Sequence, residues 1–452
     1  MTVCQRGRHP GYLLRVHKEI VNVGGEPTLT FSDQEGNINA DLSIGADVAG
    51  TEALRANLGL SFMGVAVNGD GFLVTPAQAA SLGLGRVPHL DQHIRQYLNG
   101  RDLTQRSRGM MAIDLFGLSE AEARQRFPDA YQHVLVHVKP SRDANRRDSI
   151  RELWWQFGWP RPELRRALAG LPRFIATVET SKHRVLCFLP AEVLPDNRLA
   201  CVPSDDAFHL GALSSRLHVC WALASGGTLE DRPIYNKTRC FDPFPFPDAT
   251  AEQRTTIAAL AEELDALRRT RLDAHKQLTM TGLYNVLEKL RAAQPLTPAE
   301  RDMHDAGHVS VLRRLHDELD AAVADAYGWP RDLPPAEIVE RMVALNIARR
   351  AEEADGLVRW LRPAFQAPTE QRRAAQGEMA VPAGEEAGLP PWPARDPERF
   401  VALRAVLAAS PGKPADLSRR FQRASAGKVR AMLETLAALG QARLAEDGRY
   451  HL

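Results

Sequence analysis

The sequence is poor in cysteine. Its 452 residues contain five cysteines, with no CxxC pair and no Cys/His spacing that would bind zinc. A metal-binding or disulfide-rich secreted fold is therefore not indicated. We expect reduced thiols in a cytoplasmic protein, with a disulfide between Cys187 and Cys201 as the less favoured alternative.

Long apolar runs and a surplus of charge are also missing. No run approaches the ~20 apolar residues that a membrane-spanning helix needs, and the basic start MTVCQRGRHPGYLLRVHKEI lacks the apolar core of a signal peptide. We therefore expect no membrane partner. Because 57 basic residues nearly cancel 56 acidic ones, the formal net charge is +1 and only the local distribution of charge is informative.

The sequence lacks the motifs of nucleotide-dependent and hydrolytic enzymes. GxxxxGK[ST], HExxH, GxSxG and GxGxxG are all absent. VNGDGF (67–72) is rich in glycine, but no helix follows it directly, so we interpret it as a strand–turn–strand hairpin. LPPW (389–392) resembles the Asp/Asn-Pro-Pro-aromatic motif of amino-methylating enzymes, but leucine cannot accept a hydrogen bond from the target amine. The sequence thus predicts no catalytic, metal-binding or cofactor-binding residue in this chain.

The first half of the chain has the pattern of an α+β domain. Residues 1–248 alternate strand-like runs such as RFIATV and RVLCFLP with helical patterns such as RPELRRALAGL. The domain is expected to end in FDPFPFPD (241–248). Its three phenylalanines should pack the last part of the domain, and its prolines should prevent the sheet from continuing.

Three further parts follow. Residues 249–362 predict a helical arm or bundle, because capping boxes at Thr250 and Thr297 each precede an apolar seam. Residues 363–396 are rich in Pro, Ala, Gly and Glu, which predicts a disordered linker. Residues 397–452 predict three helices and a tight hairpin at Asp447 and Gly448, hence a small winged-helix-like segment. A three-helix tail with a frayed end is an equally good interpretation.

A basic stretch interrupts the otherwise balanced charge. Residues 139–184 hold eleven Lys or Arg against five Asp or Glu, and a surface of this sign attracts a polyanion. Arginine dominates, which suits bidentate contacts to phosphates and guanine edges. Trp154, Trp155, Phe157 and Trp159 are interleaved with these cations. Most of these rings are expected to form a local core, with contact between one of them and nucleic acid as the less favoured alternative.

Two short polar segments complete the candidate DNA-binding set. ETSKHR (179–184) joins two strand-like runs and presents the mixture of acid, hydroxyl and cation that base-edge readout requires. YNKTR (235–239) could anchor phosphates. The candidate DNA-binding residues are Arg101, Arg142, Arg146, Arg147, Glu179, Ser181, Lys182, His183, Arg184, Asn236, Lys237 and Arg239.

Longer motifs in the same order are similar to a known family. YLNGRDLTQRSRG, PDAYQHVLVHVKPSRDANRRDSIRELWWQFG, PRFIATVETSKHRVLCFLPAEVLPDN and YNKTRCFDPFPFP resemble the C-terminal half of MmeI-like DNA methyltransferases of type II restriction–modification systems. The resemblance covers about residues 36–360. It implies a target recognition domain and a helical region, with the methyltransferase and nuclease domains lying upstream in the family.

The resemblance leads to three hypotheses. In the first, the chain recognises a short site on double-stranded DNA and acts with a separate methyltransferase or nuclease chain, which carries the S-adenosylmethionine. In the second, the chain is itself a site-specific adenine methyltransferase. In the third, it is a protein-interaction scaffold built on its helical and C-terminal segments.

Overall fold

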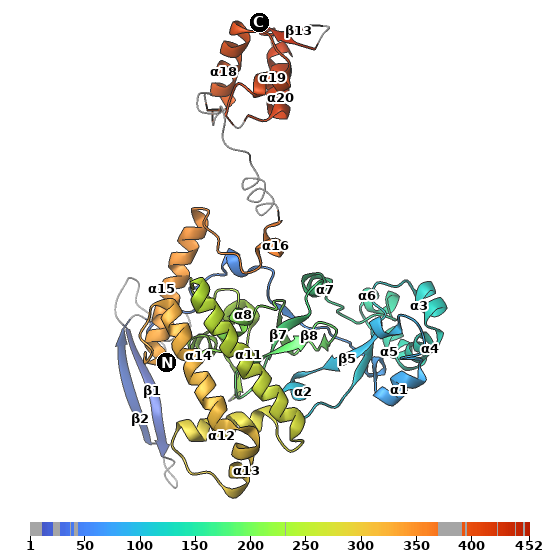
Figure 1. Cartoon of the computed structure of the whole chain (residues 1–452), viewed down its shortest axis with the longest axis vertical. Helices are drawn as coiled ribbons and strands as arrows, with labels where there is room; N and C mark the ends of the chain where they lie inside the picture. Colours follow the sequence, from blue (N-terminus) through green and yellow to red (C-terminus); the bar gives the residue numbers. More distant parts are fainter. Residues whose placement is uncertain are drawn as a thin grey trace. The chain divides into compact units, whose positions relative to one another are not determined.

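A computed structural model describes most of the chain. The described residues are 11–20, 28–36, 38–39, 44–230, 232–368, 391–393, 396–422, 424–438, 440–445 and 448–452. The chain divides into two compact units, Met1–Ala367 and Pro368–Leu452. Helices and small sheets alternate along the chain, which confirms the mixed α and β composition (Figure 1).

The first element is a long antiparallel ribbon. It consists of β1 (Gly11–Ile20) and β2 (Thr28–Gly36), drawn in blue in Figure 1. A register shift between Val16 and Lys18 places one extra residue in β1, as a β-bulge does.

The central four-stranded sheet has the order β3-β10-β7-β8. Alternate residues of its strands face opposite sides, and the two sides enter different cores. Ile175 packs with the helices that follow, whereas Phe174 and Ala176 pack against Leu164. The strands are β3 (Phe62–Met63), β7 (Arg173–Val178), β8 (Leu186–Pro190) and β10 (Leu199–Val202).

A second four-stranded sheet has the order β4-β6-β5-β9, with β5 and β9 parallel. Trp154, Trp155 and Phe157 are buried in its core, which confirms their expected packing role. The strands are β4 (Leu73–Val74), β5 (Ile94–Leu98), β6 (Met111–Ile113) and β9 (Leu194–Pro195). The neighbouring helices are α1 (Pro76–Ser81), α3 (Glu120–Arg126), α4 (Pro128–His137), α5 (Lys139–Asp143) and α6 (Asp148–Glu152). Helix α7 (Pro162–Leu168) packs against the central sheet through Leu164.

The hairpin predicted at VNGDGF is wrong. Val65 bridges Asp196 and Ala66 bridges Trp159, whereas the following β4 pairs with β6, so the two flanking segments never pair with each other. The structure requires a glycine at position 71, because a Cβ there would lie 2.6 Å from the carbonyl oxygen of His137. Glycine thus allows this turn to approach the end of α4 closely.

The helical region packs onto the central sheet and shares one continuous core with it. Capping boxes at Thr250 and Thr297 are present as predicted. Each threonine hydroxyl accepts the backbone N–H of the residue three positions on, and the side chain of that residue accepts the backbone N–H of the threonine. The helices are α8 (Ala207–Ser214), α9 (Arg216–Gly226), α11 (Ala251–Ala274), α12 (Met280–Arg291), α13 (Pro298–Gly307), α14 (Val309–Tyr327) and α15 (Pro335–Ala354).

The aromatic–proline segment before α11 is buried where the α+β and helical regions meet. Phe241, Phe244 and Phe246 lie in the shared core, which confirms their expected packing role. The amide nitrogen of Asn57 donates to the carbonyl oxygens of Phe241, Asp242 and Phe244 at 3.0, 3.0 and 2.7 Å. These bonds hold the segment against the start of the α+β region.

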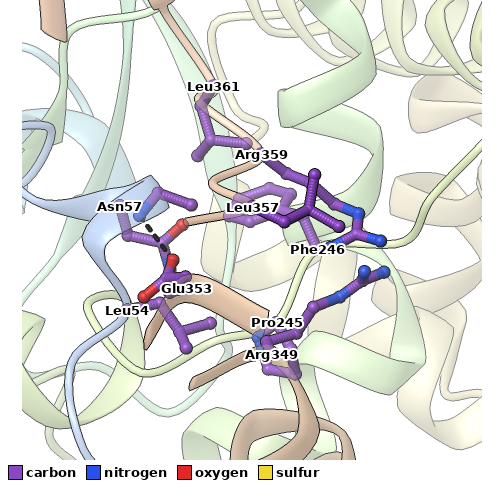
Figure 2. Close-up of a pocket in the computed structure, with 10 residues that line it drawn as sticks. Leu54, Asn57, Pro245, Phe246, Arg349, Glu353, Leu357, Arg359 and Leu361 are labelled. Carbon is purple, nitrogen blue, oxygen red and sulfur yellow. Dashed lines mark hydrogen bonds between the residues drawn. The ribbon is translucent and has the colours of Figure 1, made fainter. Parts of the chain in front are cut away.

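Helix α15 closes this junction from the other side. The buried Glu353 carboxylate accepts the backbone N–H groups of Arg55 and Ala56 at 2.7 and 2.9 Å. Asn346 donates to the carbonyl oxygens of Glu52 and Pro243. The small cavity in Figure 2 is lined by Asn57, Phe246, Glu353 and neighbouring side chains, so its polar groups already have partners within the chain.

The predicted disordered linker is wrong at its first residues. Pro363–Gln366 form a short helix, α16. The Arg362 guanidinium donates to the carbonyl oxygens of Ala167 and Pro203, and the Gln366 amide donates to those of Ala56 and Leu58. These bonds to the folded body override the loop-like composition. Residues 369–390 lie outside the described residues, so the rest of that prediction stays untested there.

The second unit has a core of its own. Helices α18 (Asp396–Ala409), α19 (Pro414–Ser418) and α20 (Ala426–Ala438) precede the antiparallel pair β13 (Arg443–Leu444) and β14 (Tyr450–His451). Three helices and a terminal hairpin are thus present, with Gly448 at φ +80° in the turn. Asp447 lies outside the described residues.

Two expectations about the whole chain can be compared with the described residues. Cys187, Cys201, Cys220 and Cys240 are free thiols, so the alternative disulfide is wrong. Of the helices that the structure describes, none is both long and apolar enough to cross a membrane.

Candidate nucleic-acid interface

A cleft of about 460 Å³ opens where four loop segments of the α+β region meet. They are the start of α2 (Gly100–Thr104), the end of β7, the turn before β10 and the hairpin of β11 (Thr228–Leu229) and β12 (Arg232–Pro233). Loop positions on a rigid sheet are where binding side chains are commonly placed. The lining residues are Asn99, Gly100, Arg101, Thr104, Val178, Glu179, Thr180, Asp196, Arg198, Leu229 and Arg232.

The α2 wall is fixed by its cap. The Asn99 side chain accepts the N–H groups of Arg101 and Asp102 at 3.0 and 3.1 Å, and the Asp102 carboxylate accepts the backbone N–H of Asn99. Arg108 Nη2 lies 2.8 Å from the Asp102 carboxylate. Burial alone would raise the pKa of Asp102, but bonds from Arg108 and Asn99 outweigh it and lower that pKa. The cap therefore stays charged and holds exposed Arg101 at the cleft.

The opposite wall carries an acceptor and a donor together. Arg198 Nη1 lies 3.1 Å from Glu179 Oε2, and the Glu179 N–H donates to the Arg198 carbonyl oxygen at 2.8 Å. The Arg198 side chain is 70% exposed and that of Glu179 is 27% exposed, so both remain within reach of a ligand in the cleft. A surface pair of this kind exchanges partners at low cost.

Asp196 forms the base of this wall. Its backbone N–H donates to the Leu98 carbonyl oxygen at 2.8 Å, and its carboxylate accepts the Tyr97 hydroxyl. Burial, reinforced by that bond to Asp196, raises the pKa of Tyr97. The phenol therefore stays protonated and keeps donating, which fixes the carboxylate in place.

Three lining residues carry positive charge and two carry negative charge. Arg101, Arg198 and Arg232 oppose Glu179 and Asp196. Arg232 is paired with exposed Glu230 at 2.7 Å. Guanidinium donors beside carboxylate acceptors can bind phosphates and distinguish polar edges on a ligand.

Of the sequence-predicted residues, Arg101 and Glu179 line this cleft. Arg198, Arg232, Asn99 and Asp196 were missed. Each is an ordinary polar residue in a short turn, and no local pattern distinguishes it from other turn residues. Only the sheet, which aligns the turn before β10 with the end of β7, places them together.

Lys182 and His183 contact the helical region instead. Lys182 Nζ lies 3.0 Å from Asn285 Oδ1 and 2.8 Å from Glu288 Oε2, and His183 Nε2 lies 2.8 Å from the same Asn285 oxygen. The Ser181 hydroxyl donates to the His183 carbonyl oxygen. Lys182 and His183 therefore link the turn after β7 to α12, whereas Ser181 bonds within that turn.

The prediction that Arg142 and Arg184 bind DNA must be corrected, because both side chains are buried. The Arg142 side chain donates to the carbonyl oxygens of Val67 and Gln156, and Arg184 donates to those of Val178 and Pro233. Desolvation lowers the pKa of both guanidinium groups. Both side chains support the fold from within and are not exposed at the surface, so the basic composition of their surroundings was misleading.

The remaining predicted residues lie elsewhere on the surface. Asn236 caps α10 (Lys237–Cys240) by accepting the Thr238 N–H at 3.1 Å, Lys237 lies 3.9 Å from the Asp242 carboxylate, and exposed Arg239 lines a separate small cleft. Arg146 and Arg147 are exposed between α5 and α6, and the Arg147 guanidinium lies 5.0 Å from the centre of the Trp159 ring. Neither group lines the 460 Å³ cleft.

Comparisons with known proteins agree with this architecture. Residues 52–248 match the family model described as the target recognition domain of MmeI. This confirms the resemblance expected from the sequence for that part of the chain. No curated protein matches the chain.

Solved structures similar to this one include the Type IIL restriction-modification enzyme MmeI in complex with DNA. The match has a TM-score of 0.55 and 19% sequence identity, and it covers 72% of this chain and 40% of the MmeI chain. The likeness therefore concerns the fold, and this chain corresponds to less than half the length of that enzyme.

Proposed function

We propose that this chain is the sequence-reading part of a restriction–modification DNA methyltransferase and binds double-stranded DNA in the cytoplasm. The supporting observation is the match of residues 52–248 to the MmeI target recognition domain. The cleft lined by Arg101, Glu179 and Arg198 lies entirely within that range. MmeI itself has been described in complex with DNA, which favours the same class of ligand here.

In this proposal the two walls of the cleft have different tasks. Glu179 accepts a hydrogen bond from the N4 amino group of cytosine, and Arg198 donates to O6 and N7 of guanine. Arg101 and Arg232 contact phosphates and set the register without reading sequence. The Glu179–Arg198 ion pair keeps both groups oriented before DNA arrives.

Catalysis is assigned to another polypeptide. The sequence contains neither GxxxxGK[ST] nor GxGxxG, and its Leu389 stands where an amino-methylating motif requires Asp or Asn. S-adenosylmethionine is therefore expected on a separate methyltransferase or nuclease chain. The helices and hairpin of residues 397–452 are proposed to form a winged-helix-like accessory segment.

Selection from random duplex DNA tests the recognition role. The chain, alone and with its methyltransferase partner, should enrich one short sequence. Glu179→Gln should reduce the preference at one base pair by about 1–3 kcal/mol, because an amide donates where the carboxylate only accepts. Glu163→Gln, on exposed α7 and outside the cleft, is the matched control. If no sequence is enriched in either setting, the recognition role is wrong.

Arg101→Ala tests the phosphate role. Affinity should fall for all duplexes alike, and the slope of log affinity against log salt should decrease in magnitude by about one. A loss confined to particular sequences would instead assign Arg101 to base readout.

The competing enzyme hypothesis has its own test. Titration of the purified chain with S-adenosylmethionine in a calorimeter should give no saturable heat. A saturable signal from this chain alone would favour the adenine methyltransferase hypothesis over a recognition subunit.

A further inference from the structure

The second unit carries a local excess of positive charge. Residues 397–452 contain ten Lys or Arg against five Asp or Glu, which leaves 47 basic and 51 acidic residues for the rest of the chain. An excess of this sign creates a field that attracts a polyanion. The cleft of the first unit does not account for it, because the residues that line that cleft all lie before residue 248.

A third strand position joins the terminal hairpin of this unit. Gly412, between α18 and α19, pairs with Tyr450 of β14. The Tyr450 N–H donates to the Gly412 carbonyl oxygen at 3.0 Å, and the Gly412 N–H donates to the Tyr450 carbonyl oxygen at 3.2 Å. The order along the chain is therefore helix, strand position, helix, helix and hairpin (Figure 1). Winged-helix domains have this order, and in a helix-turn-helix pair the second helix, here α20, lies in the major groove of DNA.

The core of the unit fixes which side of α20 faces outward. Val429, Leu433 and Leu436 are buried, and they share one face because an α-helix has 3.6 residues per turn. Lys428 and Arg430 flank Val429 in sequence, so each lies about 100° around the helix axis from it, in opposite directions. Both are exposed. The outward face of α20 thus has a cation along each of its two sides.

These cations have no carboxylate partner. Within the described residues, no ion pair of this unit involves Lys428, Arg430 or the exposed Arg443 of β13. Several surface arginines of the first unit do form pairs, as Arg314 does with Glu318 at 2.8 Å. A cation without a partner can bind a phosphate without first giving up an internal contact, so its full attraction is available to a ligand.

Double-stranded DNA fits this arrangement better than an acidic protein surface does. Its major groove is about 12 Å wide, admits an α-helix and is bordered by two rows of phosphates. The cations on the two sides of α20 can therefore contact both rows, and Arg443 on the following hairpin can add a third contact. Glu434 is exposed nearer the C-terminal end of α20. The helix is therefore expected to enter the groove by its N-terminal end, away from that carboxylate.

We propose that the second unit is a winged-helix domain that gives the chain a second contact with double-stranded DNA. The N-terminal half of α20 lies in the major groove, and Lys428, Arg430 and Arg443 bind phosphates without reading sequence. This contact does not depend on the cleft of the first unit. It raises the affinity of the chain for any duplex and leaves the preferred sequence unchanged.

Fluorescence anisotropy of a long duplex of arbitrary sequence, titrated with the full chain at several salt concentrations, tests this contact. Lys428→Glu combined with Arg430→Glu should lower the affinity by about tenfold or more. The slope of log affinity against log salt should also decrease in magnitude by about two, because two phosphate contacts are lost.

A matched pair of single variants separates a local contact from net charge. Arg430→Glu and Arg404→Glu change the charge of the same unit equally at exposed positions, but Arg404 lies on α18. Arg430→Glu should reduce the salt slope, whereas Arg404→Glu should change the affinity by no more than about twofold, since salt screens distant charges. Equal losses would overturn the winged-helix contact.

Three further results decide the matter. Unchanged affinity and salt slope in the double variant would overturn DNA binding by this unit, and an acidic protein partner would then be the better explanation of its charge. A loss of the same size on single-stranded DNA would overturn binding in the groove. Calorimetry should show that the double variant keeps the thermal transition of the second unit. If it does not, Lys428→Gln combined with Arg430→Gln replaces it and should reduce the salt slope in the same direction.

The recognition role is judged by a different readout. Selection from random duplex DNA with the double variant should return the same sequence as selection with the unaltered chain. If the unaltered chain enriches no sequence, the recognition role fails, and the salt slopes still decide the second contact. If the salt slopes of the variant and the unaltered chain agree, the second contact is wrong, and the recognition role stands.

Discussion

Arg165 and Arg166 are neighbours on α7 with opposite surroundings. Arg165 Nη1 and Nη2 lie 2.7 and 3.1 Å from the two oxygens of Asp114, whose side chain is 3% exposed. The Arg166 side chain is 76% exposed, and its Nη2 makes a loose contact of 3.9 Å with Glu163 Oε1. Two residues of one type in one basic stretch therefore have different roles, which are decided by what each guanidinium contacts.

Charge reversal at these two positions should separate the roles. Arg165→Glu should lower the free energy of unfolding by about 3–5 kcal/mol, because it leaves the Asp114 carboxylate buried beside a like charge. Arg166→Glu should change it by no more than about 0.5 kcal/mol. Urea denaturation followed by circular dichroism measures both, and equal losses would contradict this assignment.

At the scale of elements, the junction of α15 with residues 52–58 and 241–246 is a dense set of polar contacts in an apolar core (Figure 2). Glu353, Asn346 and Asn57 each bond to backbone groups of segments far away in sequence. The N–H groups of Arg55 and Ala56 open a short 3-10 helix, and the other backbone groups lie outside helices and strands or at their ends, so no helix or sheet satisfies them. The side chains therefore take the place of regular secondary structure.

Glu353→Gln tests this junction. The amide can accept only one of the two backbone N–H bonds and places a donor against the other, so the free energy of unfolding should fall by about 1–3 kcal/mol. Glu352→Gln is the matched control, because the Glu352 side chain is 37% exposed and pairs with Arg349 and Arg359 at the surface. That variant should lose no more than about 1 kcal/mol. If the two variants lose similar free energies of unfolding in thermal or urea denaturation, the buried bonds of Glu353 contribute no more to stability than the surface pairs of Glu352.

The whole molecule consists of two units with separate cores. Among the described residues, the core of the second unit consists of side chains of that unit. Each unit should therefore unfold independently, since cooperativity requires a shared core.

Truncation after Ala367 tests that independence. The shortened chain should keep the midpoint of thermal unfolding of the first unit, and differential scanning calorimetry of the full chain should show one further transition. Its DNA preference should also persist, because the cleft residues all lie before residue 248. A large drop in the midpoint would instead show that the second unit stabilises the first.

Buried histidines make the stability of the first unit depend on pH. Burial lowers the pKa of His218 to about 3 and that of His316 to about 3, and each imidazole contacts a tyrosine hydroxyl. Below the ordinary value of about 6.5, the unfolded chain binds protons that the folded chain does not. Stability is therefore lost as the pH falls from about 6.5 toward 3, by about 1.4 kcal/mol per pH unit for each histidine.

A comparison with His218→Gln isolates this effect. Between about pH 6 and pH 4, the free energy of unfolding of the unaltered chain should fall more steeply than that of the variant by about 1.4 kcal/mol per pH unit. Asp320, whose pKa burial raises to about 6, acts with the opposite sign but equally in both proteins. Urea unfolding at several pH values measures the two slopes, and parallel slopes would rule out His218 as a contributor.

The sequence by itself determined the features that depend on neighbouring residues. Capping boxes at Thr250 and Thr297, the apolar seams of the helices and the burial of Phe241 and Phe244 were all predictable. Caps and periodic seams involve residues three or four positions apart, so one chain suffices to recognise them. The long motifs also sufficed for the resemblance to MmeI that residues 52–248 confirm.

Only the tertiary structure decided which polar residues share a site. Arg101, Glu179, Arg198 and Arg232 come from four separate turns, and pairing of β7 with β10 brings two of them together. The same packing turned Arg142 and Arg184 inward, although their sequence surroundings are as basic as those of Arg146. Composition sets how many cations a segment has, whereas the direction of each side chain depends on backbone pairing and on available acceptors, which no local pattern encodes.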